Sequence, residues 1–542
     1  MNVEQEYDYV IVGAGSAGCV VANRLTEDAS KQVLLIEAGG PARHPNVAIP
    51  VGFGELIGSK YDWLIESEPE PTLADRQIIL PRGKVIGGSS SINAMVYFRG
   101  HKLDFDNWAA LGATGWAYDD VLPYFKRSEH NERFSDEFHG VGGPLNVTDA
   151  HRDPLTTLMV ESAVKWGVAP NSDFNGAETD GVGPLQVTQK KGRRWSEADA
   201  FLRPAKKRKN LTVLTGALVH RVAIEGGKAV GVVYDSGNGP ETVRAGGEVV
   251  ICAGAYGTPA LLQLSGVGPA SHLGKLGIDC VAELPVGENL MDHASATLNW
   301  EVSGPDVGLA DAKHPKYLAQ WLFKRSGKLT SNVMEANACI RIADDVPAPD
   351  FQLAIAPAYF FDHGRAEHPN PAITLGPVML QPESRGTVRI RSADPRTLPS
   401  VRLNFFSQPG ELDRMTKALK ICREIIAGGV FGSRLGREIN PGPSVQSDAD
   451  VNQWIQRNGE HLYHPVGTAR IGTPETGVVD PELRVYGIDR LRVADASVMP
   501  MIVRANTNAA TIMIGERCAD FIRGAGPRHA SNGEIAAAAS VA

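Results

Sequence analysis

The feature that most constrains the fold is a glycine-rich segment near the start of the chain, Tyr7–Gly40. A short apolar run, Tyr9–Val12, is typical of a buried parallel strand, and three glycines follow it in the spacing G-x-G-x-x-G. Ser16–Leu25 has the small, apolar composition of a packed helix, and Val33–Ile36 is typical of a second buried strand. This order predicts a βαβ unit that binds a dinucleotide.

Each glycine of this motif, and the acid that follows it, has a physical role. Gly13 makes the tight turn, Gly15 lets the backbone approach a pyrophosphate, and Gly18 lets the helix lie close to the strand. Glu37, at the end of the second strand, can accept hydrogen bonds from the two hydroxyls of a ribose. This acid favours FAD or NAD over NADP. The alternative interpretation is a tight strand–helix turn that binds no ligand.

Length and composition bound the function. A chain of 542 residues is too long for one core, so we expect two or three domains. The net charge of −8 argues against nucleic acid as a partner. No apolar run reaches the roughly 18 residues of a membrane span, and no secretory signal is recognised. The six cysteines lack C-x-x-C or metal-ligand spacing, so we expect no metal site and a reducing cytoplasm.

Two further segments are typical of cofactor contacts. Pro81–Gly100 contains a loop rich in glycine and serine that can cradle phosphate or lie against a ring, although alone it could be a surface loop. Glu248–Cys252 is typical of another buried strand, and Ala253–Pro269 continues it with a glycine turn and a helix. This repeat of the opening pattern predicts a second place where backbone amides meet a cofactor.

The middle of the chain has a different pattern of apolar and polar residues. From about residue 300 to 460, alternating segments predict a mostly antiparallel sheet, with strands near Ala336–Ile342, Phe351–Ile355 and Thr387–Arg391. Glu411–Ile426 is predicted to be an amphipathic helix that packs on a core. This block is the best candidate for a separate domain that faces the substrate.

A basic cluster lies between these parts. We expect a helix over Arg193–Leu202, and four consecutive basic residues, Lys206 to Lys209, follow it. The first interpretation of this cluster is a solvated helix end, and the second is contact with anionic lipid headgroups.

The candidate catalytic residues lie late in the chain. His464 sits in the loop sequence YHPVGT, and Asn506 and Asn508 precede or open a predicted helix. Histidine suits proton abstraction near neutral pH, and an asparagine can donate a hydrogen bond to a substrate oxygen. The alternatives are a structural histidine and asparagines that cap the helix. No G-x-S-x-G or H-E-x-x-H motif is present.

Four ordered motifs make the chain resemble the glucose–methanol–choline (GMC) flavoprotein oxidoreductases over about residues 6–523. The glycine-rich start resembles their FAD fingerprint, and Pro81–Gly100 resembles their first signature. Gly254–Pro269 is similar to their second signature, and YHPVGT with the closing ANTNAATIMIGERCAD is similar to their C-terminal pattern. Within the family, the chain most resembles the bacterial FAD-dependent alcohol dehydrogenases and choline dehydrogenases.

The resemblance assigns roles to single residues. It makes His464 the catalytic histidine and Asn506 the second member of a His–Asn pair, with Glu335 and Tyr463 expected at the substrate. Some family members attach FAD covalently through a histidine at the position of Ile92, so here we expect noncovalent FAD. The residues expected to bind FAD are Gly13, Gly15, Ser16, Ala17, Gly18, Glu37, Ala38, Gly83, Gly88, Asn93, Ala94, Met95, Val96, Val219, Asp495, Ala496 and Asn508.

The activity implied by the resemblance is oxidation of a primary alcohol to an aldehyde. His464 would take the hydroxyl proton, flavin N5 would take the hydride, and a quinone or another acceptor would take the electrons. Three alternatives stay open: an alcohol or choline oxidase that uses O₂, a flavin-dependent lyase or decarboxylase on the same fold, and a NAD-dependent dehydrogenase. The sequence leaves the particular alcohol and the oligomeric state open.

The expected architecture is α/β (α+β overall), with a Rossmann-like FAD-binding domain and a substrate-binding domain built on a mostly antiparallel β-sheet with helices. We expect a cytoplasmic protein, with peripheral contact to the inner face of the membrane as the second interpretation of the basic cluster. The expected boundaries are residues 1–155, 196–300 and 461–524 for the FAD-binding domain, 156–195 and 301–460 for the substrate-binding domain, and 525–542 for a disordered tail.

Overall fold

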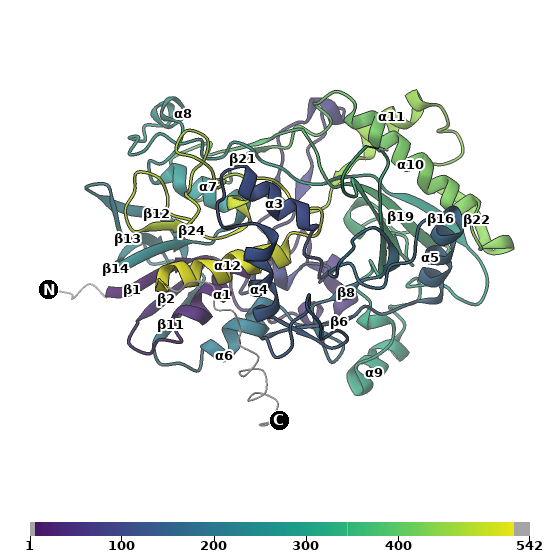
Figure 1. The fold of residues 1–542 in the computed structure, drawn as a ribbon, viewed down its shortest axis with the longest axis horizontal. Helices are drawn as coiled ribbons and strands as arrows, with labels where there is room; N and C mark the ends of the chain where they lie inside the picture. The colour runs from purple at the N-terminus through teal and green to yellow at the C-terminus, as the bar shows by residue number, and fades with distance from the viewer. Residues whose placement is uncertain (1–5, 344, 525–542) are drawn as a thin grey trace.

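Two large β-sheets, one in each half of the molecule, organise the chain (Figure 1). The computed structural model describes residues 6–343 and 345–524, so the expected tail 525–542 lies outside the described residues. The predicted class of fold, α/β with a nucleotide-binding half and a second half on an antiparallel sheet, is confirmed. The expected domain boundaries stay a prediction.

The first sheet has seven strands in the order β11-β2-β1-β14-β13-β12, with β24 beside β14. The pairs that join β11, β2, β1, β14 and β24 are parallel, and β12 and β13 add an antiparallel edge. Every residue of β2 is buried, as expected of a parallel strand with both faces covered. The strands are β1 (Glu6–Val12), β2 (Val33–Glu37), β11 (Leu211–Thr215), β12 (Leu218–Glu225), β13 (Lys228–Asp235), β14 (Pro240–Ile251) and β24 (Leu491–Val493).

Helices from opposite ends of the sequence cover this sheet. Helix α1 (Ser16–Leu25) has the predicted bounds, and the C-terminal helix α12 (Asn508–Arg523) packs beside it (Figure 1). The approach is close, because a Cβ on Gly515 would lie 3.0 Å from the carbonyl oxygen of Ala17. The last helix therefore returns to the nucleotide-binding half, as its sequence suggested.

The second sheet is antiparallel, with the order β22-β16-β19-β18-β17-β7 and two short strands, β15 and β23, at its side. The strands are β7 (Gly181–Pro184), β15 (Ala294–Ser295), β16 (Leu298–Val302), β17 (Ala336–Ile340), β18 (Phe351–Ala356), β19 (Ala372–Met379), β22 (Leu435–Asn440) and β23 (Glu460–His461).

The prediction that Thr387–Arg391 forms a strand of this sheet was wrong. Thr387–Arg391 does not join it but forms β20 (Thr387–Arg389), which pairs with β21 (Ser400–Arg402) in a separate ribbon. The reason is local, since Val388 pairs with β21 and its N–H donates to the carbonyl of Gly287. The segment thus satisfies its backbone groups without the larger sheet.

The predicted helix over Arg193–Leu202 was also wrong. Residues Arg193–Arg194 form β10, which pairs with β9 (Gln189–Lys190), and only Ala198–Leu202 forms a short π-type turn. Arg194 lies in this hairpin, and its buried guanidinium donates to the carbonyls of Val47 and Ser90, which are distant in the sequence.

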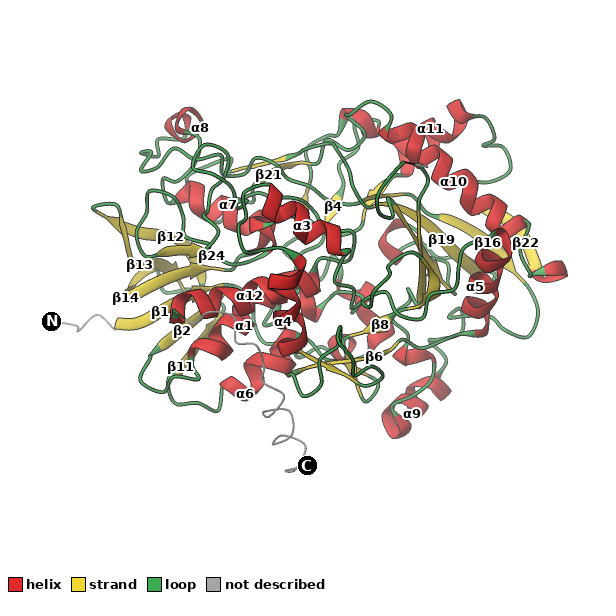
Figure 2. Cartoon of the chain, in the orientation of Figure 1, coloured by secondary structure: helices red, strands yellow, loops and turns green. Residues whose placement is uncertain are grey.

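Helices surround both sheets, and α5 and α10 cover the second one (Figure 2). The predicted apolar stripe of α10 is buried core, as expected. Among the residues that the structure describes, no helix has the length and apolar character needed to cross a membrane. The remaining helices are α2 (Pro45–Ala48), α3 (Lys102–Ala110), α4 (Tyr118–Ser128), α5 (Pro154–Trp166), α6 (Arg203–Ala205), α7 (Gly254–Leu264), α8 (Ala270–Lys275), α9 (Pro315–Lys324), α10 (Glu411–Ala427) and α11 (Asp448–Asn458), and the remaining strands are β3 (Ile65–Glu66), β4 (Ile79–Leu80), β5 (Glu129–Asn131), β6 (Leu145–Asp149) and β8 (Gln186–Val187).

Candidate active site

A cavity of about 870 Å³ is lined by residues of both halves of the molecule. It runs along the glycine-rich turn after β1 and reaches the loop that carries His464. The structure brings nearly all the predicted site residues to this one cavity, and only Gly18 and Glu335 are not on its wall. The predicted residues that line it are Gly13, Gly15, Ser16, Ala17, Glu37, Ala38, Gly83, Gly88, Asn93, Ala94, Met95, Val96, Val219, Tyr463, His464, Asp495, Ala496, Asn506 and Asn508.

The glycines of the first motif have the geometry that their predicted roles need. Gly13 has a φ of +100°, and a Cβ there would lie 2.4 Å from the carbonyl oxygen of Cys252. A Cβ on Gly18 would lie 1.9 Å from the carbonyl oxygen of Gly13, so Gly18 packs the helix onto the turn instead of facing the cavity. A Cβ on Gly15 would meet no protein atom closer than 4.0 Å, so this side of the turn is open to a ligand.

Glu37 is buried and holds the same turn in place. Its carboxylate accepts hydrogen bonds from the backbone N–H groups of Ala14 and Gly39, each at 2.8 Å. Burial raises the pKa of Glu37 to about 7, although both hydrogen bonds act in the opposite direction. The carboxyl group lines the cavity, where it can reach a ribose hydroxyl.

These residues fit a dinucleotide such as FAD. Helix α1 has Gly15 at its N-cap, without a side-chain cap, and has no acid in its first turn, so its first N–H groups are available to a phosphate. Gly88 lies against the same turn, because a Cβ there would be 2.7 Å from Cα of Gly15. Residues 93–96 line the same cavity, which reaches the loop of His464 at its other end.

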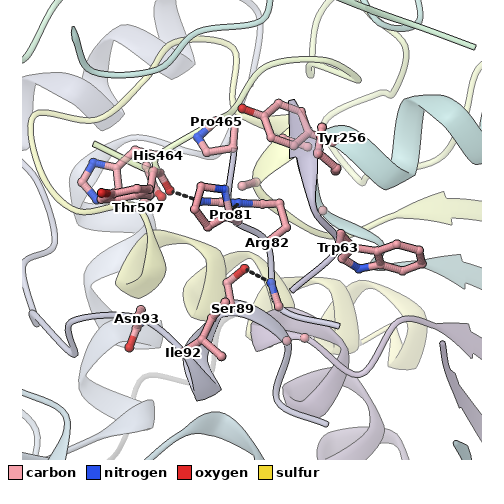
Figure 3. Close-up of a pocket in the computed structure, with 18 of the residues that line it drawn as sticks. Trp63, Pro81, Arg82, Ser89, Ile92, Asn93, Tyr256, His464, Pro465 and Thr507 are labelled. Atoms are coloured by element: carbon pink, nitrogen blue, oxygen red, sulfur yellow. Dashed lines mark hydrogen bonds between the residues drawn. The ribbon is translucent and has the colours of Figure 1, made fainter. Parts of the chain in front are cut away.

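His464 and Asn506 lie in contact at that end (Figure 3 shows His464 at the cavity wall). Asn506 Nδ2 lies 3.1 Å from His464 Nε2. An amide nitrogen can only donate, so His464 Nε2 accepts and carries a lone pair. Burial, and next the neighbouring His293, lower the pKa of His464 well below its ordinary value. His464 is therefore a neutral base with its free nitrogen beside a hydrogen-bond donor.

Sequence reasoning missed His293, which completes this arrangement. His293 Nδ1 lies 2.9 Å from His464 Nδ1, and burial lowers the pKa of His293 to about 4. Since His464 Nε2 accepts, the proton of the neutral ring is on Nδ1, and it donates to His293. The only sequence signal was a loop that joins two acids and a histidine, residues 284–293.

Asp292, also missed, fixes the backbone of both histidines. Its Oδ1 accepts from the N–H groups of His293 at 2.7 Å and His464 at 2.8 Å, and its Oδ2 lies 3.0 Å from Nδ1 of His461. Burial raises the pKa of Asp292, but His461, His464 and Arg82 together oppose this, and the pKa lies below its ordinary value. The carboxylate therefore stays charged and joins β15 to the loop of His464.

The two asparagines do not cap helix α12. Thr507 occupies the N-cap position, and no side chain bonds the first turn. Asn508 instead accepts from the hydroxyl of Ser16 at 2.6 Å and donates to Glu197 at 3.0 Å. The capping interpretation was wrong because both amides are used by tertiary contacts at the cavity.

Glu335 does not lie on the cavity wall, and its expected role at the substrate stays a prediction. Its carboxylate accepts from the N–H of Asp153 and from the hydroxyls of Thr156 and Ser331, at 2.6–2.7 Å. Its neighbour Met334 lines the cavity, and successive side chains of an extended backbone point to opposite sides. Burial raises the pKa of Glu335 to about 7.

Five of the described residues other than glycine have left-handed backbone on the cavity wall: Met95, Val333, Asp362, His363 and Tyr463. Met95, Val333 and Tyr463 have φ values of 60°, 71° and 66°. This conformation is costly, above all for a β-branched residue, and such strain gathers at functional sites. The hydroxyl of Tyr463 lies 2.7 Å from Nδ1 of His363, which holds the tyrosine at the cavity.

A nucleotide-binding sheet, an open glycine turn and a neutral histidine paired with an asparagine define a dinucleotide-dependent oxidoreductase. The comparison with family models is more specific. The models of the GMC oxidoreductases match residues 7–295 and 382–515, and the chain belongs to this family. The predicted enzyme class, an oxidoreductase of this family, is confirmed, and the family supports FAD as the cofactor.

Similar proteins agree with this assignment. The chain is 43% identical over 526 residues to an alcohol dehydrogenase (acceptor) of Pseudomonas putida, with 95% of each chain covered. It is 41% identical over 537 residues to an oxygen-dependent choline dehydrogenase of Sinorhizobium fredii, with 97% of each covered. A solved structure of formate oxidase from Aspergillus oryzae has a TM-score of 0.91 at 28% identity, and the match covers 96% of this chain and 98% of that one. That structure concerns the effect of a mutation on FAD modification.

Proposed function

We propose that the protein oxidises a neutral primary alcohol to the aldehyde with noncovalently bound FAD. The observation that carries the proposal is the neutral Nε2 of His464 at the cavity wall, beside the amide of Asn506. The names of the two similar dehydrogenases support an alcohol as the substrate class.

The residues of the chain account for the proton of the reaction. His464 Nε2 takes the hydroxyl proton of the alcohol. The proton on Nδ1 of His464 stays there, hydrogen-bonded to Nδ1 of His293. The amide of Asn506 can turn its N–H to the substrate oxygen as negative charge develops there. FAD, when bound, supplies the acceptor for the hydride of the carbinol carbon. The products are the aldehyde, one proton and a two-electron-reduced cofactor.

The proposal of noncovalent binding rests on Ile92. This side chain stands directly before Asn93 on the cavity wall, and a saturated hydrocarbon offers no nucleophile to the cofactor. Acid precipitation of the purified protein tests it. We expect the yellow colour to move into the supernatant, and colour that stays with the pellet would contradict the proposal.

The charges on the cavity wall favour a neutral substrate over choline. A quaternary ammonium group is held best by a carboxylate without other partners, and next by an aromatic face that no other cation occupies. Lys84 already lies 4.6 Å from the ring centre of Trp63, and the side chains that β18 and β19 contribute to the wall are uncharged. Among the described wall residues, the carboxylates all have partners: Glu37 (the amides of Ala14 and Gly39), Asp362 (Arg365), Glu460 (Arg76) and Asp495 (Thr258 and the amide of Gly254).

For the electron acceptor we propose a quinone or a similar organic carrier; the name of the Pseudomonas relative specifies an acceptor without saying which one. The test has two stages. Anaerobic addition of a panel of apolar primary alcohols and choline should bleach the flavin band with the apolar alcohols and far less with choline. Parallel assays with a dye acceptor and for peroxide then compare the two routes. Absence of bleaching with every alcohol would contradict the function, and peroxide as the main product would contradict the acceptor alone.

A further inference from the structure

Helix α9 exposes an unusual amount of apolar surface. Phe323 is 87% exposed, Leu322 is 50% exposed and Leu318 is 45% exposed. No other helix in the described part of the chain has three large exposed apolar side chains. Leu318 and Leu322 are four residues apart and lie on the same face, and Phe323 is about 100° further round the helix, so the three form one broad apolar stripe. Water-exposed stripes of this kind are characteristic of contact sites.

The opposite side of α9 is fixed to the protein. Trp321 is buried and packs with Leu309 and Leu329, and its Nε1–H donates to the carbonyl of Gly192 at 2.7 Å. Tyr317 donates its hydroxyl proton to Asp311 at 2.8 Å. The helix cannot rotate to bury the stripe without breaking these contacts. The exposed stripe is therefore a permanent surface feature.

The segment around the stripe is basic in an acidic protein. Residues 313–328 contain five basic residues and no aspartate or glutamate, whereas the whole chain has a net charge of −8. Lys316 and Lys328 face Asp311, and Lys313 faces Glu367 in a fully exposed pair, which is worth little in water. Lys324, beside Phe323, has no acidic partner in the described residues.

A second basic feature lies on the same edge of the molecule. Helix α6 is followed by the exposed Lys206, Lys207 and Lys209, and α6 and α9 both lie along the lower edge of the view in Figure 1. Trp321 of α9 belongs to an apolar cluster against which Val333 packs, and Val333 also lines the cavity, so this edge is linked to the wall of the proposed site.

We propose that α9 is a membrane-contact helix that binds the surface of an anionic lipid bilayer, with Leu318, Leu322 and Phe323 inserted at the headgroup–acyl boundary. An apolar stripe flanked by lysines is the composition of helices that lie in this interface. The lysines match anionic headgroups, whose attraction reaches about one Debye length. A second copy of the chain is a poorer partner, because a two-fold contact at α9 would place this basic segment against itself.

The test uses full-length protein with FAD bound and vesicles of phosphatidylcholine with or without phosphatidylglycerol. We expect co-sedimentation with the anionic vesicles only, and weaker binding at high salt. The triple variant Leu318→Gln, Leu322→Gln, Phe323→Gln should lower the partition coefficient by at least about tenfold. The double variant Lys316→Glu, Lys324→Glu should lower it for anionic vesicles. The matched control, Leu111→Gln with Val141→Gln, removes two exposed apolar side chains elsewhere and should bind as the wild type does.

The flavin spectrum and the reduction of FAD by an alcohol report whether each variant is folded, and we expect both to be unchanged in the α9 variants. Wild-type protein that ignores anionic vesicles, or a triple variant that binds them as the wild type does, would overturn the proposal. A wild-type dimer in light scattering that the triple variant converts to a monomer would assign the stripe to self-association instead, and would also overturn it.

Discussion

His293 Nδ1 lies 2.9 Å from His464 Nδ1, and the two buried rings are nearly perpendicular, at 87°. Two nitrogens at this distance share one proton, so the protonation of one ring depends on the other. The acceptor on His293 keeps the proton of His464 away from Nε2, the nitrogen that faces Asn506. His293 is therefore a positioning residue for the proposed base.

The first prediction follows from this contact. His293→Ala should lower kcat/KM for an alcohol by about 10–100-fold, because His464 loses the partner that fixes its tautomer. His293 also lowers the pKa of His464, so its removal raises that pKa. The base works only unprotonated, so the acidic limb of the pH–kcat/KM profile should move to higher pH. If the variant lowers the plateau of kcat/KM but leaves the acidic limb of the pH profile at the wild-type pH, His293 has a structural role only.

The second prediction concerns the base itself. His464→Ala should lower the rate of anaerobic flavin reduction by about 10²–10⁴-fold, because the proposed base for the hydroxyl proton is lost. Asn506→Ala should cost about 10²–10³-fold through loss of the donor to the substrate oxygen. Stopped-flow reduction of the flavin measures both. Each variant should keep its FAD, and a His464 variant that is reduced at the wild-type rate would remove this residue from the mechanism.

The third prediction separates two glycines of the same motif. Gly15→Ala should fold, since its Cβ would meet no protein atom closer than 4.0 Å, but should bind FAD at least about tenfold more weakly because the methyl group projects into the cavity. Gly18→Ala should destabilise the fold by about 1–3 kcal/mol or more, since its Cβ would lie 1.9 Å from a carbonyl oxygen. Thermal melts and the flavin content after desalting measure these effects. Equal FAD retention in the two variants would contradict the assignment.

The fourth prediction concerns Glu335, which lies off the cavity wall. Glu335→Gln should leave KM for an alcohol within about twofold, since the side chain touches Thr156 and Ser331 instead of a ligand. The folded pKa of about 7 is above the unfolded value of 4.5, so the folded state binds the extra proton between these values. Wild-type stability should therefore fall as the pH rises through this window, by about 3 kcal/mol from this group.

The glutamine variant carries no titrating proton at this position, so its unfolding free energy should change less with pH. Denaturant melts of both proteins at pH 5 and pH 8 give the comparison. A parallel pH dependence in the two proteins would contradict the raised pKa, and a large rise in KM would return Glu335 to the substrate site.

The local sequence pattern was sufficient to predict the strands and the helix of the nucleotide-binding unit. The predicted helix Ser16–Leu25 has the bounds of α1, and the two strands around it differ from β1 and β2 only at their ends. Strand, turn and helix are decided by neighbours in sequence, so they can be predicted from composition and glycine spacing. The segment Arg193–Leu202 failed because the bonds of Arg194 reach residues a hundred or more positions away.

What the sequence by itself determined is the family, the glycine turn, and His464 with Asn506, because each is carried by a motif of adjacent residues. Only the tertiary structure decided that His293 and Asp292 hold His464, that Glu335 faces away from the cavity, and that the stripe on α9 is exposed. These facts depend on which surfaces meet when distant strands pair. The pairing of β15 with β23 brings residue 293 to residue 464, and no local signal encodes that contact.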